Sequence, residues 1–183
     1  EVVDKTLLKD RLDVELIEGI VNAVGTSSIT GTSQLEKDEI QIGDKIYKIG
    51  TADVRTILGF NVEGYIYKDT KTNKETLLLA VPVEGANNTV AIPSENIDTI
   101  TNEEGSKSIN YWKNPDSDKK STKASIANDA KVMYNGKSGS FSDFKVIDSG
   151  NIVLLDSDNN GVFDIVFVNE TKNYVVEEVV EEP

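Results

Sequence analysis

The sequence predicts an all-β fold with one or two short helices, arranged as two tandem small domains of barrel or sandwich type. Alternating apolar and polar residues, which indicate half-buried strands, run through most of the chain. Turn-forming glycines and asparagines interrupt the alternation at short intervals. The same order of strands and turns returns when the chain is shifted by 87 residues. That internal similarity favours two related units.

Strand signals follow one another closely in the first half of the chain. A long alternating segment comes first, then two short strands around the Gly43-Asp44 turn, then a hairpin with a polar loop. The expected strands are 13–25, the two parts of 39–50, 61–68 and 75–85. A short helix is expected at 51–59, because Thr51 can cap it and Gly59 can close it. Residues 1–12 are expected to form a leading helix or an arm.

The second half repeats this character. The expected strands are 88–93, 95–101, 109–114, 129–137, 150–156, 163–169 and 173–180. A second short helix is expected at 138–145, where two phenylalanines lie three residues apart. The segment 114–123 is polar and is expected to be a solvated linker.

The 87-residue shift predicts where the chain divides. It places Tyr47 on Tyr134 and lays residues 67–81 on 154–168 without a gap. A tandem duplication would split the chain near Thr99–Glu104, which gives an arm or helix at 1–12, a first β-domain at 13–100 and a second at 101–183. One longer β-sandwich without a true repeat is the alternative.

Composition narrows the classes of function. The chain has 183 residues and a formal net charge of −13, from 32 acidic and 19 basic residues. Such a surface repels nucleic-acid phosphates and anionic lipid headgroups, so nucleic acid is not an expected partner. No apolar stretch approaches the length of a transmembrane helix, and no membrane insertion is expected.

The chain contains neither cysteine nor histidine. The usual ligands of zinc, iron and copper are therefore missing, as are cysteine nucleophiles and histidine general bases. This favours a protein that is not an enzyme.

A calcium-type loop stands in the stretch "LLDSDNNGVFDIVFV", residues 154–168. Oxygen-bearing side chains occur at alternate positions, and Gly161 permits a sharp turn that brings a backbone carbonyl toward an ion. The predicted Ca²⁺ ligands are Asp156, Asp158, Asn160, the carbonyl of Val162, and Asp164. Three carboxylates without a bidentate glutamate predict weak affinity, with Kd on the order of 10⁻⁴ to 10⁻³ M.

Two observations limit this interpretation. Phe167 stands where an EF-hand loop carries its bidentate glutamate, and the flanks alternate as strands, so the loop is not an EF-hand. Asp, Asn and Gly also form ordinary hairpin turns, which is the alternative without an ion. The 87-residue shift places Lys71 and Leu77 on two of the ligand positions, so only the second copy would hold a cation.

Three phrases carry a family resemblance: "VEGYIYKD" (62–69), "AKVMYNGK" (130–137) and "IVLLDSDNNGVFDIVFV" (152–168). They are similar to β-rich modules in surface proteins of Gram-positive Firmicutes that carry surface-layer homology domains, and to segments of structural proteins of tailed bacteriophages. The acidic loop also resembles the "DxDxDGxxD" calcium hairpins of integrin-type propeller repeats and of bacterial surface proteins, with Asn at the third acidic position. The resemblance spans most of residues 14–180 and implies a scaffold or attachment role on a cell surface or a virion.

These observations favour a non-enzymatic structural or assembly module, extracellular or in a virion, whose partners are other protein subunits. A carbohydrate- or protein-binding adhesin module is the first alternative. It would need an exposed aromatic cleft to bind, for example, cell-wall glycan, and Tyr111 with Trp112 is the local candidate. An accessory domain of a secreted hydrolase is the second alternative, and it would need an acidic cleft with carboxylates on separate strands.

Overall fold

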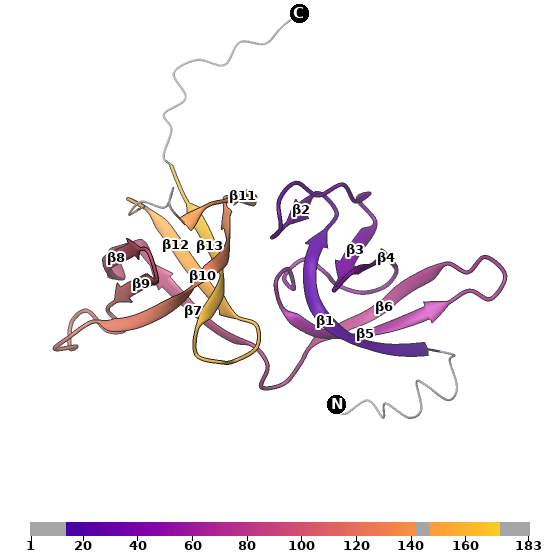
Figure 1. The fold of residues 1–183 in the computed structure, drawn as a ribbon, viewed down its shortest axis with the longest axis horizontal. Coiled ribbons are helices and arrows are strands. Elements are labelled where there is room, and N and C mark those ends of the chain that lie inside the picture. Colours follow the sequence, from indigo (N-terminus) through magenta and orange to yellow (C-terminus); the bar gives the residue numbers. More distant parts are fainter. Residues whose placement is uncertain (1–13, 142–146, 173–183) are drawn as a thin grey trace, which may run out of the picture.

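The strands pair into two separate sheets, each of which forms one small unit (Figure 1). The computed structural model describes residues 14–141 and 147–172. The first sheet contains β1 (Val14–Val24), β2 (Ser27–Ser28), β3 (Glu39–Ile42), β4 (Lys45–Ile49), β5 (Asn61–Lys68) and β6 (Glu75–Pro82). The second contains β7 (Asn88–Pro93), β8 (Ile97–Glu103), β9 (Ser106–Tyr111), β10 (Thr122–Tyr134), β11 (Lys137–Gly139), β12 (Gly150–Asp156) and β13 (Phe163–Glu170), with the 3₁₀ turn η1 (Ser94–Asn96) between β7 and β8. The predicted all-β fold of two small units is confirmed.

The first sheet closes on itself as a five-stranded barrel. Its strands follow the order β1-β3-β4-β6-β5, and β5 pairs again with β1. The β4–β6 pairing is parallel, and the others are antiparallel. Closure is possible because β1 is long enough to pair twice: Val14–Ile20 pairs with β5, and the end of the strand from Val21 pairs with β3.

The second sheet has the same strand order, but the strand that closes it is broken. Its order is β8-β9-β10-β13-β12, again with one parallel pairing, between β10 and β13. β12 pairs onward with β7, and η1 joins β7 directly to β8. The break follows Pro93, which cannot donate a ladder hydrogen bond. The first unit is thus a small Greek-key barrel of the kind represented by the OB fold, and the second has the same strand order in an incompletely closed barrel, a likeness of fold alone.

Strand pairing divides the chain earlier than the repeat predicts. The last strand of the first sheet ends at Pro82 and the first strand of the second begins at Asn88, so the sheets meet at 83–87 and not at 100/101. The gap-free alignment of 67–81 on 154–168 is also wrong. Tyr67 pairs with Thr76, which would place Leu154 opposite Phe163, yet Leu154 pairs with Val166. Alternating strands match one another at any even shift, and this is why the alignment looked continuous. The duplication itself stays a prediction.

The helix expected at 51–59 is not formed. This segment is a series of turns instead. The Thr51 hydroxyl donates to the Leu78 carbonyl at 2.7 Å instead of capping a helix, and Ala52 and Ile57 are buried in the core of the first barrel. Of the second expected helix, 138–145, the described part begins within β11, and residues 142–146 lie outside the described ranges. The expected arm at 1–12 and strand at 173–180 also lie outside them.

A buried apolar cluster joins the two barrels. Ile29 from the first barrel packs with Met133, Leu155 and Ile165 from the second. Partly buried residues of both barrels surround this group: Ile20, Leu58, Phe60 and Phe167. The hairpin of β12 and β13 therefore serves both the core of its own barrel and the junction between barrels. Within the described ranges, no helix has the length and apolarity needed to cross a membrane.

Candidate metal centre

The predicted loop connects β12 to β13 in the second barrel. The alternation of β12 turns Ile152 and Leu154 into the barrel core, where both are fully buried. Asp156 ends this strand, and Asp164 lies near the start of β13. The two carboxylates consequently lie close together at the base of the loop, with one oxygen of each within 4.8 Å of the other.

Asp156 is fully buried, and both of its oxygens are occupied. Its Oδ1 accepts a hydrogen bond from the Asn160 amide at 3.1 Å, and its Oδ2 accepts one from the Gly161 amide at 2.8 Å. Gly161 has φ +88, the left-handed conformation that glycine adopts without steric cost. Asp156 thus closes the loop on itself, and burial of its charge is offset by two backbone donors.

Only one of the two carboxylate oxygens of Asp164 accepts hydrogen bonds from the described residues. Its Oδ2 accepts both the backbone amide of Ser157 at 3.0 Å and the Ser157 hydroxyl at 2.8 Å. Its Oδ1 is buried and has no hydrogen-bond partner within the described structure. A buried carboxylate oxygen without a donor is costly.

The electrostatics of Asp164 reflect this position. Burial raises the pKa of the Asp164 carboxyl above its ordinary value, and the two hydrogen bonds from Ser157 lower it in part. The negative charges of Asp158 and Asp156 raise that pKa further. The site therefore disfavours the ionised form of Asp164 as long as no positive charge compensates it.

The loop tip contributes Asp158 and Asn160. Asp158 is exposed, and its oxygens accept the Asn160 amide at 3.3 Å and the Asn160 side-chain nitrogen at 2.9 Å. The Asn160 side-chain oxygen accepts the Val162 amide at 2.8 Å. The structure thus engages the predicted Asn160 ligand oxygen within the turn, and no described interaction draws the Val162 carbonyl toward the carboxylates.

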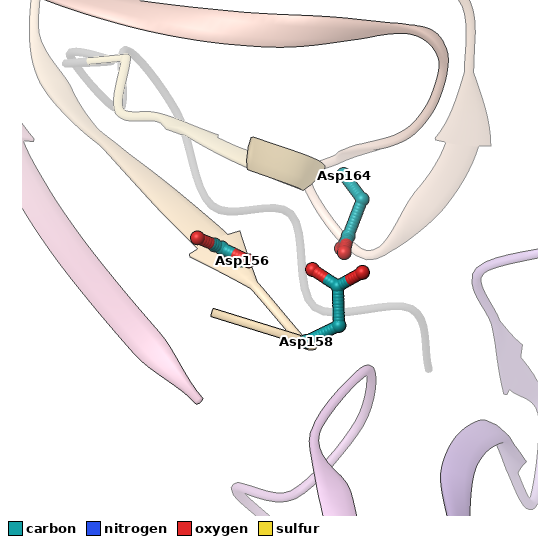
Figure 2. Close-up of side chains that lie close together, drawn as sticks. All are labelled: Asp156, Asp158 and Asp164. Atoms are coloured by element: carbon teal, nitrogen blue, oxygen red, sulfur yellow. The ribbon is translucent and has the colours of Figure 1, made fainter. Parts of the chain in front are cut away.

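Three of the five predicted ligands come together. Asp156, Asp158 and Asp164 each offer one carboxylate oxygen, and these oxygens lie within 4.8 Å of one another (Figure 2). Calcium–oxygen distances of about 2.3–2.6 Å place two ligands of one ion at most about 5 Å apart. The spacing of these three oxygens is thus within the range that one cation of this size can bridge. Figure 2 shows Asp158 and Asp164 directed toward one another, with Asp156 at the end of β12.

Two residues that position the loop have no recognisable signal in the sequence. Ser157 is buried and holds Asp164 through two hydrogen bonds, but a serine between two aspartates has no distinctive pattern. Asn159 has φ 54, and its side-chain nitrogen donates to the Gly85 carbonyl at 2.9 Å, in the connection between the barrels. Contacts between positions so distant in sequence leave no local signal.

The corresponding loop of the first barrel is an ordinary turn. The Oδ1 of Asp69 accepts the backbone amides of Lys71 and Thr72 at 2.8 and 3.0 Å. No second carboxylate of the described chain joins Asp69 in an acidic cluster. This loop provides an internal reference for the acidic one.

The two alternative sites have less support. Tyr111 is buried in the core of the second barrel, so Tyr111 and Trp112 do not form an exposed aromatic pair. Asp156 and Asp164 do lie on separate strands, as a hydrolytic site would require. However, Asp156 is fully buried and both of its oxygens accept backbone amides, so it is not placed to meet a substrate.

Comparison with known proteins identifies no family, so the functional assignment depends on the geometry of the site. No protein-family model matches the chain, and no curated protein matches it significantly.

Proposed function

We propose that this protein is a non-enzymatic structural module of a bacterial cell-surface or phage virion assembly, and that its last hairpin binds Ca²⁺ weakly. The main support for cation binding is the Oδ1 of Asp164. This oxygen is buried, has no donor within the described structure and lies beside two further carboxylates. A divalent cation would occupy this oxygen and neutralise the repulsion within the cluster. Asp156, Asp158 and Asp164 would be the protein ligands, and Asn160 and Val162 could join after the loop rearranges.

The position of the hairpin supports a structural role for the ion. Leu155 and Ile165, next to two of the carboxylates, pack in the junction between the barrels. A cation that stiffens the loop would therefore also support the contact between the two units. In this role the ion braces the scaffold and takes part in no reaction.

The setting of the module rests on the resemblance to surface-layer-type and phage structural segments. Its partners would be other protein subunits of the same assembly. The net charge of −13 supports a setting in which the module neither binds nucleic acid nor inserts into a membrane. Cell-wall glycan is a weaker partner candidate, since the aromatic pair expected to bind it is not exposed.

Calcium-dependent thermal stability tests the cation. At calcium concentrations about ten times Kd, binding contributes about 1.4 kcal/mol, which corresponds to a rise in Tm of roughly 3–6 °C. We expect this rise in the chelator-treated protein at millimolar calcium, measured by circular dichroism or calorimetry. Asp158→Ala should abolish it, because this variant removes an exposed carboxylate ligand whose hydrogen bonds to Asn160 lie within the loop tip.

Asp69→Ala is the matched control. It removes the same charge from the corresponding loop of the first barrel and should leave the calcium-dependent rise intact. An unchanged Tm for the wild-type protein in calcium would contradict the cation site. An equal rise in wild type and Asp158→Ala would place calcium elsewhere on the acidic surface.

A further inference from the structure

The connection between the barrels is short and folds back onto the first barrel. It consists of residues 83–87, from the end of β6 to the start of β7. The Val83 amide donates to the Asn61 carbonyl at 3.0 Å. The Asn87 side chain accepts the Asn61 amide at 2.8 Å and donates to the Asn61 carbonyl at 2.9 Å. Both ends of the connection are thus fixed to Asn61, the first residue of β5.

The middle of the connection is held by the acidic loop of the second barrel. The side-chain nitrogen of Asn159 donates to the Gly85 carbonyl at 2.9 Å. Asn159 has φ 54, the left-handed conformation that asparagine tolerates better than most residues. This hydrogen bond, which we call the latch, ties the second barrel to a segment that the first barrel already holds.

The latch is one of three contacts along the seam between the barrels. The second is the apolar cluster of Ile29, Met133, Leu155 and Ile165. The third is the close approach of β2 to β11, at the end of the seam opposite the connection (Figure 1). Domains that share a small interface usually move relative to one another. Contacts at both ends of a seam resist rotation about either end.

We propose that the two barrels and their connection form one rigid body, which the Asn159 latch locks at residues 83–87. The module then presents its two barrels to a partner at a fixed angle. A partner that contacts both barrels meets a preorganised surface, so less orientational freedom is lost on binding. This inference goes beyond the proposed function and requires no bound cation, because Asn159 is not among the proposed ligands.

Amide hydrogen exchange of the full chain, followed by NMR in the presence of a chelator, tests the latch. Asn159→Gly removes the side chain, and glycine keeps the left-handed backbone without strain. The amides of Asn61 and Val83 are released when the connection detaches from β5. Their exchange should become roughly two- to tenfold faster, the range expected for the loss of one hydrogen bond.

Asn73→Gly is the matched control. Asn73 has φ 53 and lies in the loop between β5 and β6, the corresponding loop of the first barrel. This variant should leave the exchange of Asn61 and Val83 unchanged. Unchanged exchange in Asn159→Gly as well would show that the latch does not hold the connection. Equal acceleration at these two amides and throughout β13 would show general loosening of the second barrel, which also counts against the latch.

Residual dipolar couplings of the wild-type protein test the rigid body without any substitution. One alignment tensor should describe the amides of both barrels. Two tensors of different magnitude would show that the barrels move independently, and this would overturn the proposal. Because this measurement is also made in chelator, its outcome is separate from that of the calcium-dependent rise in Tm.

Discussion

At the scale of single residues, two aspartates in one loop occupy opposite energetic situations. Asp156 is the more deeply buried, yet both of its oxygens accept backbone amides. Asp164 keeps one buried oxygen that no donor of the described residues meets. Their sequence positions make them equivalent candidate ligands, and only the local hydrogen bonding distinguishes the satisfied turn residue from the incomplete one.

Asp164→Asn should therefore stabilise the chelator-treated protein. The asparagine oxygen can keep both bonds from Ser157, and its NH₂ group would stand beside Asp158 as a donor. We expect a gain on the order of 1 kcal/mol in the free energy of unfolding, measured with urea at neutral pH. The same variant should lose the calcium response. Asp158→Asn, the exposed control, should change the chelator-treated protein by less than about 0.5 kcal/mol.

The sign of the pH dependence follows from the raised pKa of Asp164. The folded protein holds the Asp164 proton more tightly than the unfolded chain does, so the destabilisation is full above the folded-state pKa. It shrinks as the pH falls from there toward the ordinary value of 3.8 and is absent below it. The stability difference between Asp164→Asn and the wild type should close over this window. A wild-type protein more stable than Asp164→Asn in chelator would contradict the argument.

At the scale of elements, the hairpins were the most predictable parts of the fold. The expected strand 61–68 coincides with β5, and 150–156 coincides with β12, because their alternation reports one buried face. β10 was not predicted as one strand. Its first residues were assigned to a polar linker, but it pairs with β9 along one part and with β13 along another. Pairing with distant strands extends β10 beyond its local apolar pattern.

Neighbouring residues of β12 test the assignment of faces. Leu154→Ala should lower the free energy of unfolding by about 2–5 kcal/mol, because Leu154 is fully buried in the core of the second barrel. Val153→Ala, on the opposite side of the strand and only partly buried, should cost about 1 kcal/mol or less. Urea unfolding of both variants gives the comparison. Equal losses would show that β12 is not inserted in the described register.

At the scale of the whole molecule, the junction between the barrels is the feature that no local sequence pattern predicts. Leu154 and Leu155 are consecutive and both fully buried, but Leu154 packs inside the second barrel and Leu155 packs in the junction. Gly59 of the first barrel approaches the same group closely. A Cβ at this position would lie 2.7 Å from the Ile165 side chain and 3.2 Å from that of Leu155.

Gly59→Ala should consequently destabilise the protein more than an equivalent change elsewhere. Gly59 has φ +86, so alanine costs about 1–2 kcal/mol in backbone strain alone, and the clash with Ile165 adds to this. Gly105→Ala, at φ +76 with no described atom within 4 Å of the added Cβ, should lose only the stability that backbone strain costs. Thermal unfolding should place the Tm of Gly59→Ala below that of Gly105→Ala. Equal values would indicate that the barrels do not pack at Gly59.

The sequence alone determined the all-β character, the positions of most strands and the acidic composition of the last hairpin loop, since these depend on residues close together in the chain. Tertiary structure decided the remaining features. It places β7 and β8 at the two ends of the second sheet on either side of η1, sets the division between sheets at 83–87, and replaces the helix expected at 51–59 with turns that bury Ile57. It also leaves Asp164 with one oxygen that accepts no hydrogen bond from the described part of the chain. A local pattern records which face of a segment avoids water, but the partner that covers this face lies far away in sequence, and only the folded chain selects it.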